Sequence, residues 1–274
     1  MGGLNYSDNV ALVPSDQKES GTWFDLVFLP GYRFDLGSSQ LDLSGIFLWE
    51  KYTKKDQAPE EIQLNQVTLG YLNPGMLGKW KLEGGYRTFG TENDGLVAKS
   101  QEGNELFFGG NGPLDLGVPL IVTAKFTQRV LTNGGTEGYD PDGNLYQVSA
   151  RWTLKGNGLS QNVSGGFDLM DAKGQYKDNQ ALRLGYGLDL PLSQTMGLKT
   201  AYDLKKTDYS KADPAYGVAE SDLRHRVSAE GTYRFGGIEG LAALGEVAYE
   251  TRSSNLDART YTASLFKISA LYSF

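Results

Sequence analysis

The stretch FKISALYSF, residues Phe266 to Phe274, alternates strictly between two kinds of side chain. Successive side chains of a β-strand point to opposite faces of the sheet, so a period of two sorts them into two sets. The first set is apolar (Phe266, Ile268, Ala270, Tyr272 and Phe274), and the second is mostly polar (Lys267, Ser269, Leu271 and Ser273). The stretch therefore predicts a strand with one face toward an apolar medium and the other toward water.

The same alternation recurs along most of the chain. It covers residues 24–34, 41–49, 80–88, 120–130, 146–155, 182–190 and 226–235. No helical period intervenes, and 36 glycines and 16 tyrosines against only 9 prolines suit many strands joined by tight turns. We therefore expect an all-β protein, folded as a single domain over residues 1–274.

Composition excludes several functional classes. The net charge of -7, with 26 basic against 33 acidic residues, argues against nucleic acid as a partner. The absence of cysteine rules out disulfides and thiolate metal sites. No run reaches the ~18 apolar residues of a membrane-spanning helix, and no secretion signal is visible, so an exported form would be the mature one. We expect no cofactor and no metal.

Charged and apolar residues are separated between the two faces of the predicted strands. In the alternating segments the polar set carries almost all charged residues, whereas the other set carries large aromatic residues near strand ends. These aromatic residues include Phe34, Trp80, Trp152, Tyr233 and Phe235. Apolar side chains toward lipid, charged ones toward a watery lumen and aromatic girdles are typical of a transmembrane barrel. Because lipid cannot hydrogen-bond an open edge, the sheet must close, which predicts an antiparallel up-and-down β-barrel.

Long and short connections alternate along the chain. A long loop is predicted over residues 205–222, for example, and a tight turn over residues 234–240. With the C-terminus in the periplasm, every long loop lies outside, as in bacterial outer-membrane barrels. The count is about fourteen strands. Twelve stays open, because Pro30 predicts a bulge or a short first strand and residues 107–113 make a poor strand.

Two short motifs carry a resemblance to known families. Tyr272-Ser273-Phe274 resembles the terminal strand of bacterial outer-membrane β-barrel proteins, which the barrel-assembly machinery recognises. Size and strand number are similar to those of small monomeric porins that pass oligosaccharides. Residues 5–10, NYSDNV, are similar to the first strand of barrel domains that follow tetratricopeptide repeats in exopolysaccharide-export and surface-lipoprotein-assembly proteins.

The resemblance implies a function and a set of partners. The expected function is a porin-like outer-membrane channel for small hydrophilic solutes or oligosaccharides. The alternative is the membrane barrel of a polysaccharide-export or surface-protein secretion system, with a periplasmic repeat domain as partner. The implied surroundings are the lipid bilayer and lipopolysaccharide, and Tyr272 and Phe274 form the implied assembly signal.

Alternation also predicts which charges line the lumen. A basic wall is expected from strands in the middle of the chain, comprising Lys81, Arg87, Lys125, Arg129, Arg151 and Arg183. An acidic wall is expected from strands near the two termini, comprising Asp25, Asp42, Glu50, Glu246 and Glu250. Opposed walls would orient dipolar solutes and hydrated sugars with weak net ion preference. The alternative is that these charges are solvated or paired across strands.

Catalysis is not expected. The single histidine, His225, shares its face with Val227, so the local serine partner of a hydrolytic site is missing. Asp140-Pro141-Asp142-Gly143-Asn144 lacks the later acidic ligands of a calcium loop and predicts a turn. Gly84-Gly85 predicts a packing or bending site in a sheet. We therefore expect that the protein is not an enzyme.

Overall fold

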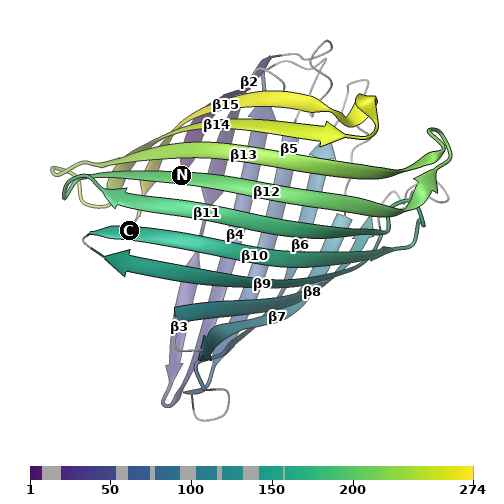
Figure 1. The fold of residues 1–274 in the computed structure, drawn as a ribbon. Coiled ribbons are helices and arrows are strands. Elements are labelled where there is room, and N and C mark those ends of the chain that lie inside the picture. The colour runs from purple at the N-terminus through teal and green to yellow at the C-terminus, as the bar shows by residue number, and fades with distance from the viewer. Residues whose placement is uncertain are drawn as a thin grey trace.

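The computed structural model describes residues 1–7, 20–53, 61–74, 78–92, 103–115, 119–131, 142–156 and 158–273. These residues form one antiparallel sheet (Figure 1). Its first strands are β1 (Gly2–Ser7), β2 (Gly21–Phe28), β3 (Gly31–Leu36), β4 (Ser39–Tyr52), β5 (Glu61–Leu72), β6 (Lys81–Glu92) and β7 (Gly103–Asp115). They are followed by β8 (Pro119–Leu131), β9 (Gly143–Gly156), β10 (Leu159–Ala172) and β11 (Asn179–Pro191). The last are β12 (Met196–Asp213), β13 (Val218–Arg234), β14 (Leu241–Ser254) and β15 (Tyr261–Tyr272).

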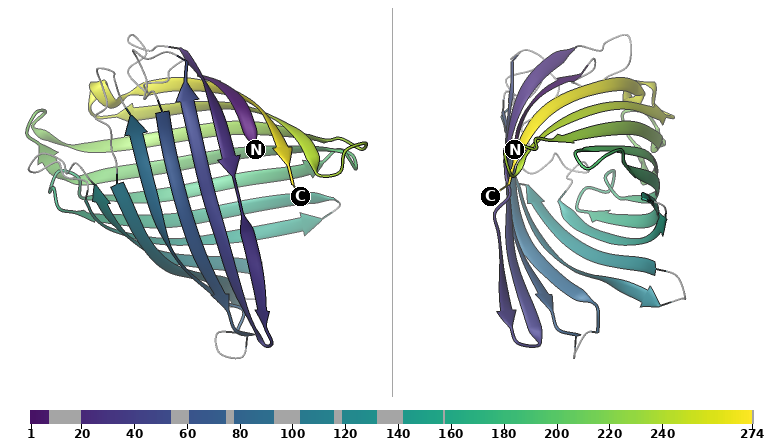
Figure 2. Two further views of the ribbon diagram at one scale, coloured as in Figure 1. Left: turned by 180° about the vertical axis from the view of Figure 1, so that it is seen from behind. Right: turned by 90° about the vertical axis from the view of Figure 1, so that its left-hand side faces the viewer.

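The sheet closes on itself through its amino-terminal strand. From β4 to β15 each strand pairs with the next along the chain, and β1 lies between β15 and β2. Leu4 of β1 lies opposite Ile268 of β15 on one side and Phe24 of β2 on the other. Because β2 also pairs with β4, the ring is complete. Both views of Figure 2 accordingly show the two chain termini close together.

The ring has fourteen positions because β2 and β3 together fill one of them. Both strands pair with β4 in succession, with Phe28 opposite Phe47 and Gly31 opposite Ser44. The interruption falls at Leu29 and Pro30, where proline has no N–H to give. The break predicted at Pro30 is therefore confirmed. Residues 103–115 form a full strand, so fourteen is right and twelve is wrong.

One connection differs from the sequence-based prediction. Residues 205–222 were expected to form a long loop, but β12 runs to Asp213 and β13 starts at Val218. The two strands form a hairpin, and the Gly217 N–H donates to the carbonyl of Asp213 at 2.7 Å. Polar residues on both faces resembled a loop, although strands outside the lipid do not need an apolar face. In the connection between β14 and β15, a short 3-10 helix, η1 (Asp257–Arg259), precedes β15.

The outer face of the ring is apolar. Large apolar side chains on this face are exposed, including Ile268 (72%), Leu106 (58%) and Val227 (53%). Tyr233 and Phe235 stack edge to face at the end of β13, with ring centroids 5.0 Å apart. Such a surface is unfavourable in water and favourable in lipid. Among the described residues, no helix is both long and apolar enough to cross a membrane.

The two halves of the chain form opposite walls of the ring. Figure 2 shows the strands of the amino-terminal half, drawn purple to blue, along one side, and the teal to yellow strands curving around the other. The side chains that alternate with the apolar outer ones point into the space between these walls. This interior contains the candidate functional site.

Candidate functional site

The strand register brings one row of interior side chains together from five strands. Arg151 of β9 lies opposite Ser164 of β10, and Ser164 lies opposite Gly185 of β11. Gly185 in turn lies opposite Asp203 of β12, and Asp203 opposite Arg226 of β13. Two small residues thus lie between charged ones along this part of the wall.

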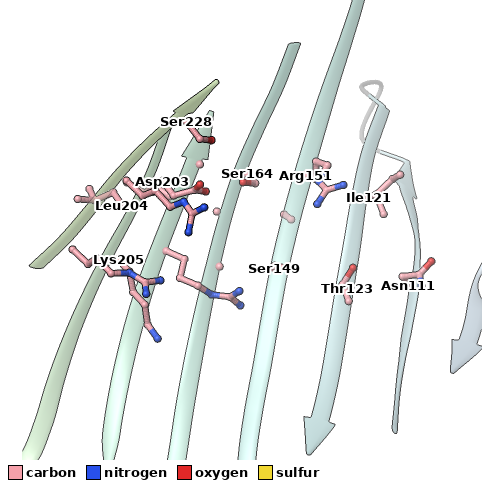
Figure 3. A pocket seen from close by; sticks show the side chains of 18 residues that line it. Asn111, Ile121, Thr123, Ser149, Arg151, Ser164, Asp203, Leu204, Lys205 and Ser228 are labelled. Atoms are coloured by element: carbon pink, nitrogen blue, oxygen red, sulfur yellow. The ribbon is translucent and has the colours of Figure 1, made fainter. Parts of the chain in front are cut away.

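A cavity of about 840 Å³ lies against this wall (Figure 3). Small residues make room for it, because Ser149, Ser164, Gly166, Gly185 and Ser228 project little into the interior. Cationic side chains surround these small residues, namely Arg151, Arg183, Lys205, Arg224 and Arg226. Asp203 is the carboxylate in the lining. The cavity is therefore polar and strongly positive.

The cations of the cavity differ in their partners. Arg183 donates to the buried carboxylate of Asp168 at 2.6 Å. Arg226 donates to Glu246 at 3.1 Å and approaches Glu250 at 4.0 Å. The other three cations differ: within the described part of the chain, Arg151, Lys205 and Arg224 have no carboxylate at salt-bridge distance.

Most residues predicted for the basic wall have local partners. Lys81 of β6 contacts Asp42 at 2.8 Å and Glu83 at 3.3 Å. Arg87 of β6 and Arg129 of β8 both bind Glu105 of β7, at 2.9 and 2.7 Å. Arg183 binds Asp168, as described above. These pairs reduce the net field that the basic wall can produce.

The two remaining basic-wall residues have different surroundings. The Lys125 ammonium lies 4.3 Å from the centre of the Phe107 ring, which is a cation–π contact. Arg151 lines the cavity. Neither residue has an ion pair within the described chain. Whether the basic wall acts as a unit on solutes stays a prediction.

The predicted acidic wall lies on β2, β4 and β14. Asp25 is 1% exposed and is paired with Lys267 of β15, while Glu50 of β4 lies opposite Asp25 in the register. Asp42 accepts a hydrogen bond from Arg33 at 2.7 Å. Glu246 binds Arg226, and Glu250 accepts a 2.6 Å hydrogen bond from the Tyr261 hydroxyl. These carboxylates therefore also have neighbours from adjacent strands. That a basic wall faces an acidic wall across the lumen stays a prediction.

Sequence reasoning missed three important interior residues. Glu105 is 4% exposed and joins Arg87 to Arg129, but it lies just before residues 107–113, the segment interpreted as a poor strand. Lys205 and Arg224 lie in or beside the segment interpreted as a loop, so neither was assigned to the wall. The signal that could have found Lys205 is the alternation Lys199, Ala201, Asp203, Lys205, Thr207, which continues the interior face of β12.

His225 lies on the outer face of β13, which it shares with Val227. Its Nδ1 atom is 2.7 Å from the hydroxyl oxygen of Tyr202 on β12. The histidine is thus held by a neighbouring strand on the face opposite to the cavity. At the C-terminus, Tyr272 is the last residue of β15 and lies opposite Leu241, whereas Phe274 is outside the described residues.

Comparison with known proteins gives a fold but no sequence family. No family model matches the chain, and no curated protein matches it. The outer membrane channel DcaP of Acinetobacter baumannii is similar in structure, with a TM-score of 0.52 at 11% identity over 100% of this chain and 94% of that chain. Pseudomonas aeruginosa OccK10 (OpdN) gives a TM-score of 0.50 at 10% identity, over 100% and 98%.

These likenesses establish the architecture. The chain has the fold of bacterial outer-membrane β-barrels, closed with fourteen antiparallel strands. The barrel predicted from the sequence is thereby confirmed, and its apolar outer face fits the predicted location in the outer membrane. The lipid bilayer is accordingly its surrounding medium.

Proposed function

We propose that the chain is a porin-like channel, through which small hydrophilic solutes or oligosaccharides diffuse across the outer membrane. The observation that carries the proposal is the contrast between the two faces of the barrel. The outer face exposes large apolar side chains, while the inside holds a cavity of about 840 Å³ lined by charged and hydroxyl-bearing residues. A polar interior within an apolar shell is the arrangement that a water-filled pore requires. That the similar DcaP is itself an outer membrane channel supports the proposal.

The test is conductance in planar lipid bilayers. The purified, folded barrel is added to one side, and stepwise increases in current are expected as single molecules insert. Protein that was heat-unfolded before addition serves as the control, because it has the same composition and no lumen. Folded protein that enters the bilayer without producing current would contradict the proposal. That result would favour the secretion-system alternative, in which a periplasmic partner is needed for transport.

The proposal includes two partners and no catalytic step. We infer that the outer rim of the barrel contacts lipopolysaccharide, since that lipid fills the outer leaflet around barrels of this location. We also infer that the barrel-assembly machinery inserts the chain by its carboxyl-terminal strand. Support comes from β15, whose outward side chains Phe266, Ile268 and Tyr272 are 51%, 72% and 56% exposed.

A further inference from the structure

Four cations lie directly opposite one another on four neighbouring strands. Arg183 of β11 is opposite Lys205 of β12, Lys205 is opposite Arg224 of β13, and Arg224 is opposite Arg252 of β14. Directly opposed residues of an antiparallel pair have Cβ atoms about 5 Å apart, and like charges at this distance destabilise the sheet. We call these four residues the cationic row.

The two ends of the cationic row are neutralised, and its centre is not. Arg183 binds Asp168 at 2.6 Å, and Arg252 binds Glu220 at 2.7 Å. Lys205 and Arg224 have no carboxylate at salt-bridge distance in the described chain, and both line the cavity. An anion placed between these two side chains would relieve the repulsion within the sheet and would receive charge-assisted hydrogen bonds from both.

The rest of the lining indicates what such an anion carries with it. Hydroxyl or amide groups come from Asn111, Thr123, Ser149, Ser164 and Ser228. Asp203 adds a carboxylate that can accept hydrogen bonds from hydroxyl groups. Leu184 is 50% exposed on the outer face, so its backbone rather than its side chain borders the cavity, and Ile121 is the main apolar side chain inside. This lining suits a hydroxyl-rich molecule far better than an apolar one.

We propose that the cavity is a binding site for acidic sugars, meaning polyhydroxyl solutes that carry a phosphate or a carboxylate group. The anionic group binds between Lys205 and Arg224, and the sugar hydroxyls contact the serine, threonine and asparagine side chains and Asp203. A volume of about 840 Å³ lies within the usual range for small-molecule sites, roughly 300–1,000 Å³. The proposal rests on the lumen being open to solutes, as the proposed channel requires.

The test is isothermal titration calorimetry of the folded full chain in detergent at low salt. Four probes separate the contributions of charge and hydroxyl groups: glucose 6-phosphate, glucuronate, glucose and benzoate. Glucose 6-phosphate and glucuronate are expected to bind, the phosphate more tightly because it carries more charge. Glucose tests the hydroxyl contacts alone, and benzoate tests the carboxylate without a sugar. Benzoate or glucose binding as tightly as glucuronate would overturn the assignment.

A matched pair of double variants locates the site. Lys205→Gln with Arg224→Gln removes the two central charges, and binding of glucose 6-phosphate should weaken about tenfold or more. Lys155→Gln with Lys199→Gln removes the same total charge from interior positions outside the cavity, and binding should change less than about twofold. Equal losses in both double variants would show a general effect of net charge and would overturn the site.

Folding of the variants can be checked by urea unfolding without ligand. Because the row contains directly opposed like charges, Lys205→Gln with Arg224→Gln should unfold at the same or a higher urea concentration than the wild type. A clear decrease would mean that the row stabilises the barrel, which contradicts the argument for a ligand. Conductance without sugar binding would contradict the proposed site but not the proposed channel. Sugar binding without conductance would contradict the proposed channel but not the proposed site.

Discussion

At the scale of single residues, the register assigns neighbouring positions of one strand to opposite media. Val227 of β13 is 53% exposed on the outer face, whereas the next residue, Ser228, lines the cavity. The two residues are neighbours in the sequence, and the period-two alternation of residues 226–235 places them on opposite faces. The direction of the side chain decides whether lipid or water solvates a charge placed there.

This difference predicts opposite outcomes for two arginine substitutions. Val227→Arg should lower the free energy of unfolding by roughly 2–4 kcal/mol, because its guanidinium must leave water for the hydrocarbon. Ser228→Arg should cost less than about 1 kcal/mol, because the cavity has room and water screens the repulsion from Arg226. Urea unfolding in lipid vesicles measures the free energy of unfolding of both variants, and Val227→Leu serves as a control for side-chain volume. Similar losses at the two positions would contradict the inside-out assignment.

At the scale of strands, glycine sets how closely β5, β6 and β7 approach one another. Gly85 faces the interior opposite Phe107, which is 5% exposed and lies in contact with it. A Cβ atom at Gly85 would overlap both the Val67 carbonyl oxygen and the Phe107 ring. At the adjacent Gly84, the nearest atoms to an added Cβ are 3.6 Å away, which is ordinary contact. The predicted packing role of Gly84-Gly85 therefore belongs to the second glycine.

Gly85→Ala should accordingly destabilise the barrel by roughly 1–3 kcal/mol, since the backbone carbonyl of Val67 cannot move aside. Gly84→Ala should have little effect, because its added methyl group makes only ordinary van der Waals contacts. Unfolding in urea, followed by tryptophan fluorescence, compares the two variants with the wild type. A larger loss for Gly84→Ala than for Gly85→Ala would show that the register assigned to β6 is wrong.

The carboxyl-terminal strand yields a prediction about assembly. Deleting Phe274 should reduce insertion into the outer membrane of cells, because the aromatic terminus is the proposed signal for the assembly machinery. Refolding of the same variant into detergent should proceed nearly as for the wild type, since β15 is paired through Tyr272 on its β14 side. Heat-modifiable migration on gels measures both processes. Normal insertion in cells would remove Phe274 from the signal.

At the scale of the whole molecule, the distribution of interior charge determines ion selectivity. Replacing Lys125, Arg129 and Arg151 with glutamate should make a weakly selective channel clearly selective for cations. The shift in reversal potential across a salt gradient should be greatest at low salt, where the Debye length is ~30 Å at 0.01 M, and should largely vanish at high salt. An unchanged reversal potential at low salt would place these side chains outside the conduction pathway.

The sequence by itself determined the class of fold. Alternation such as that of Phe266 to Phe274 requires a period of two, and lipid requires a closed sheet, so a barrel follows from local pattern and hydrogen bonding alone. The interior face of most strands followed in the same way, including Arg151 and Arg183. The break at Pro30 could also be predicted, because proline lacks the N–H that a central strand position needs.

Only the tertiary structure decided which interior charges meet. Alternation places Arg87 and Arg129 inside but does not show that Glu105 lies between them, since register depends on the pairing of whole strands. Likewise, Lys205 and Arg224 are 19 residues apart in the sequence, and only the long β12–β13 hairpin brings them opposite each other. The cavity and its cationic row exist because neighbouring strands pair in one register, and that register is a property of the closed barrel rather than of any single strand.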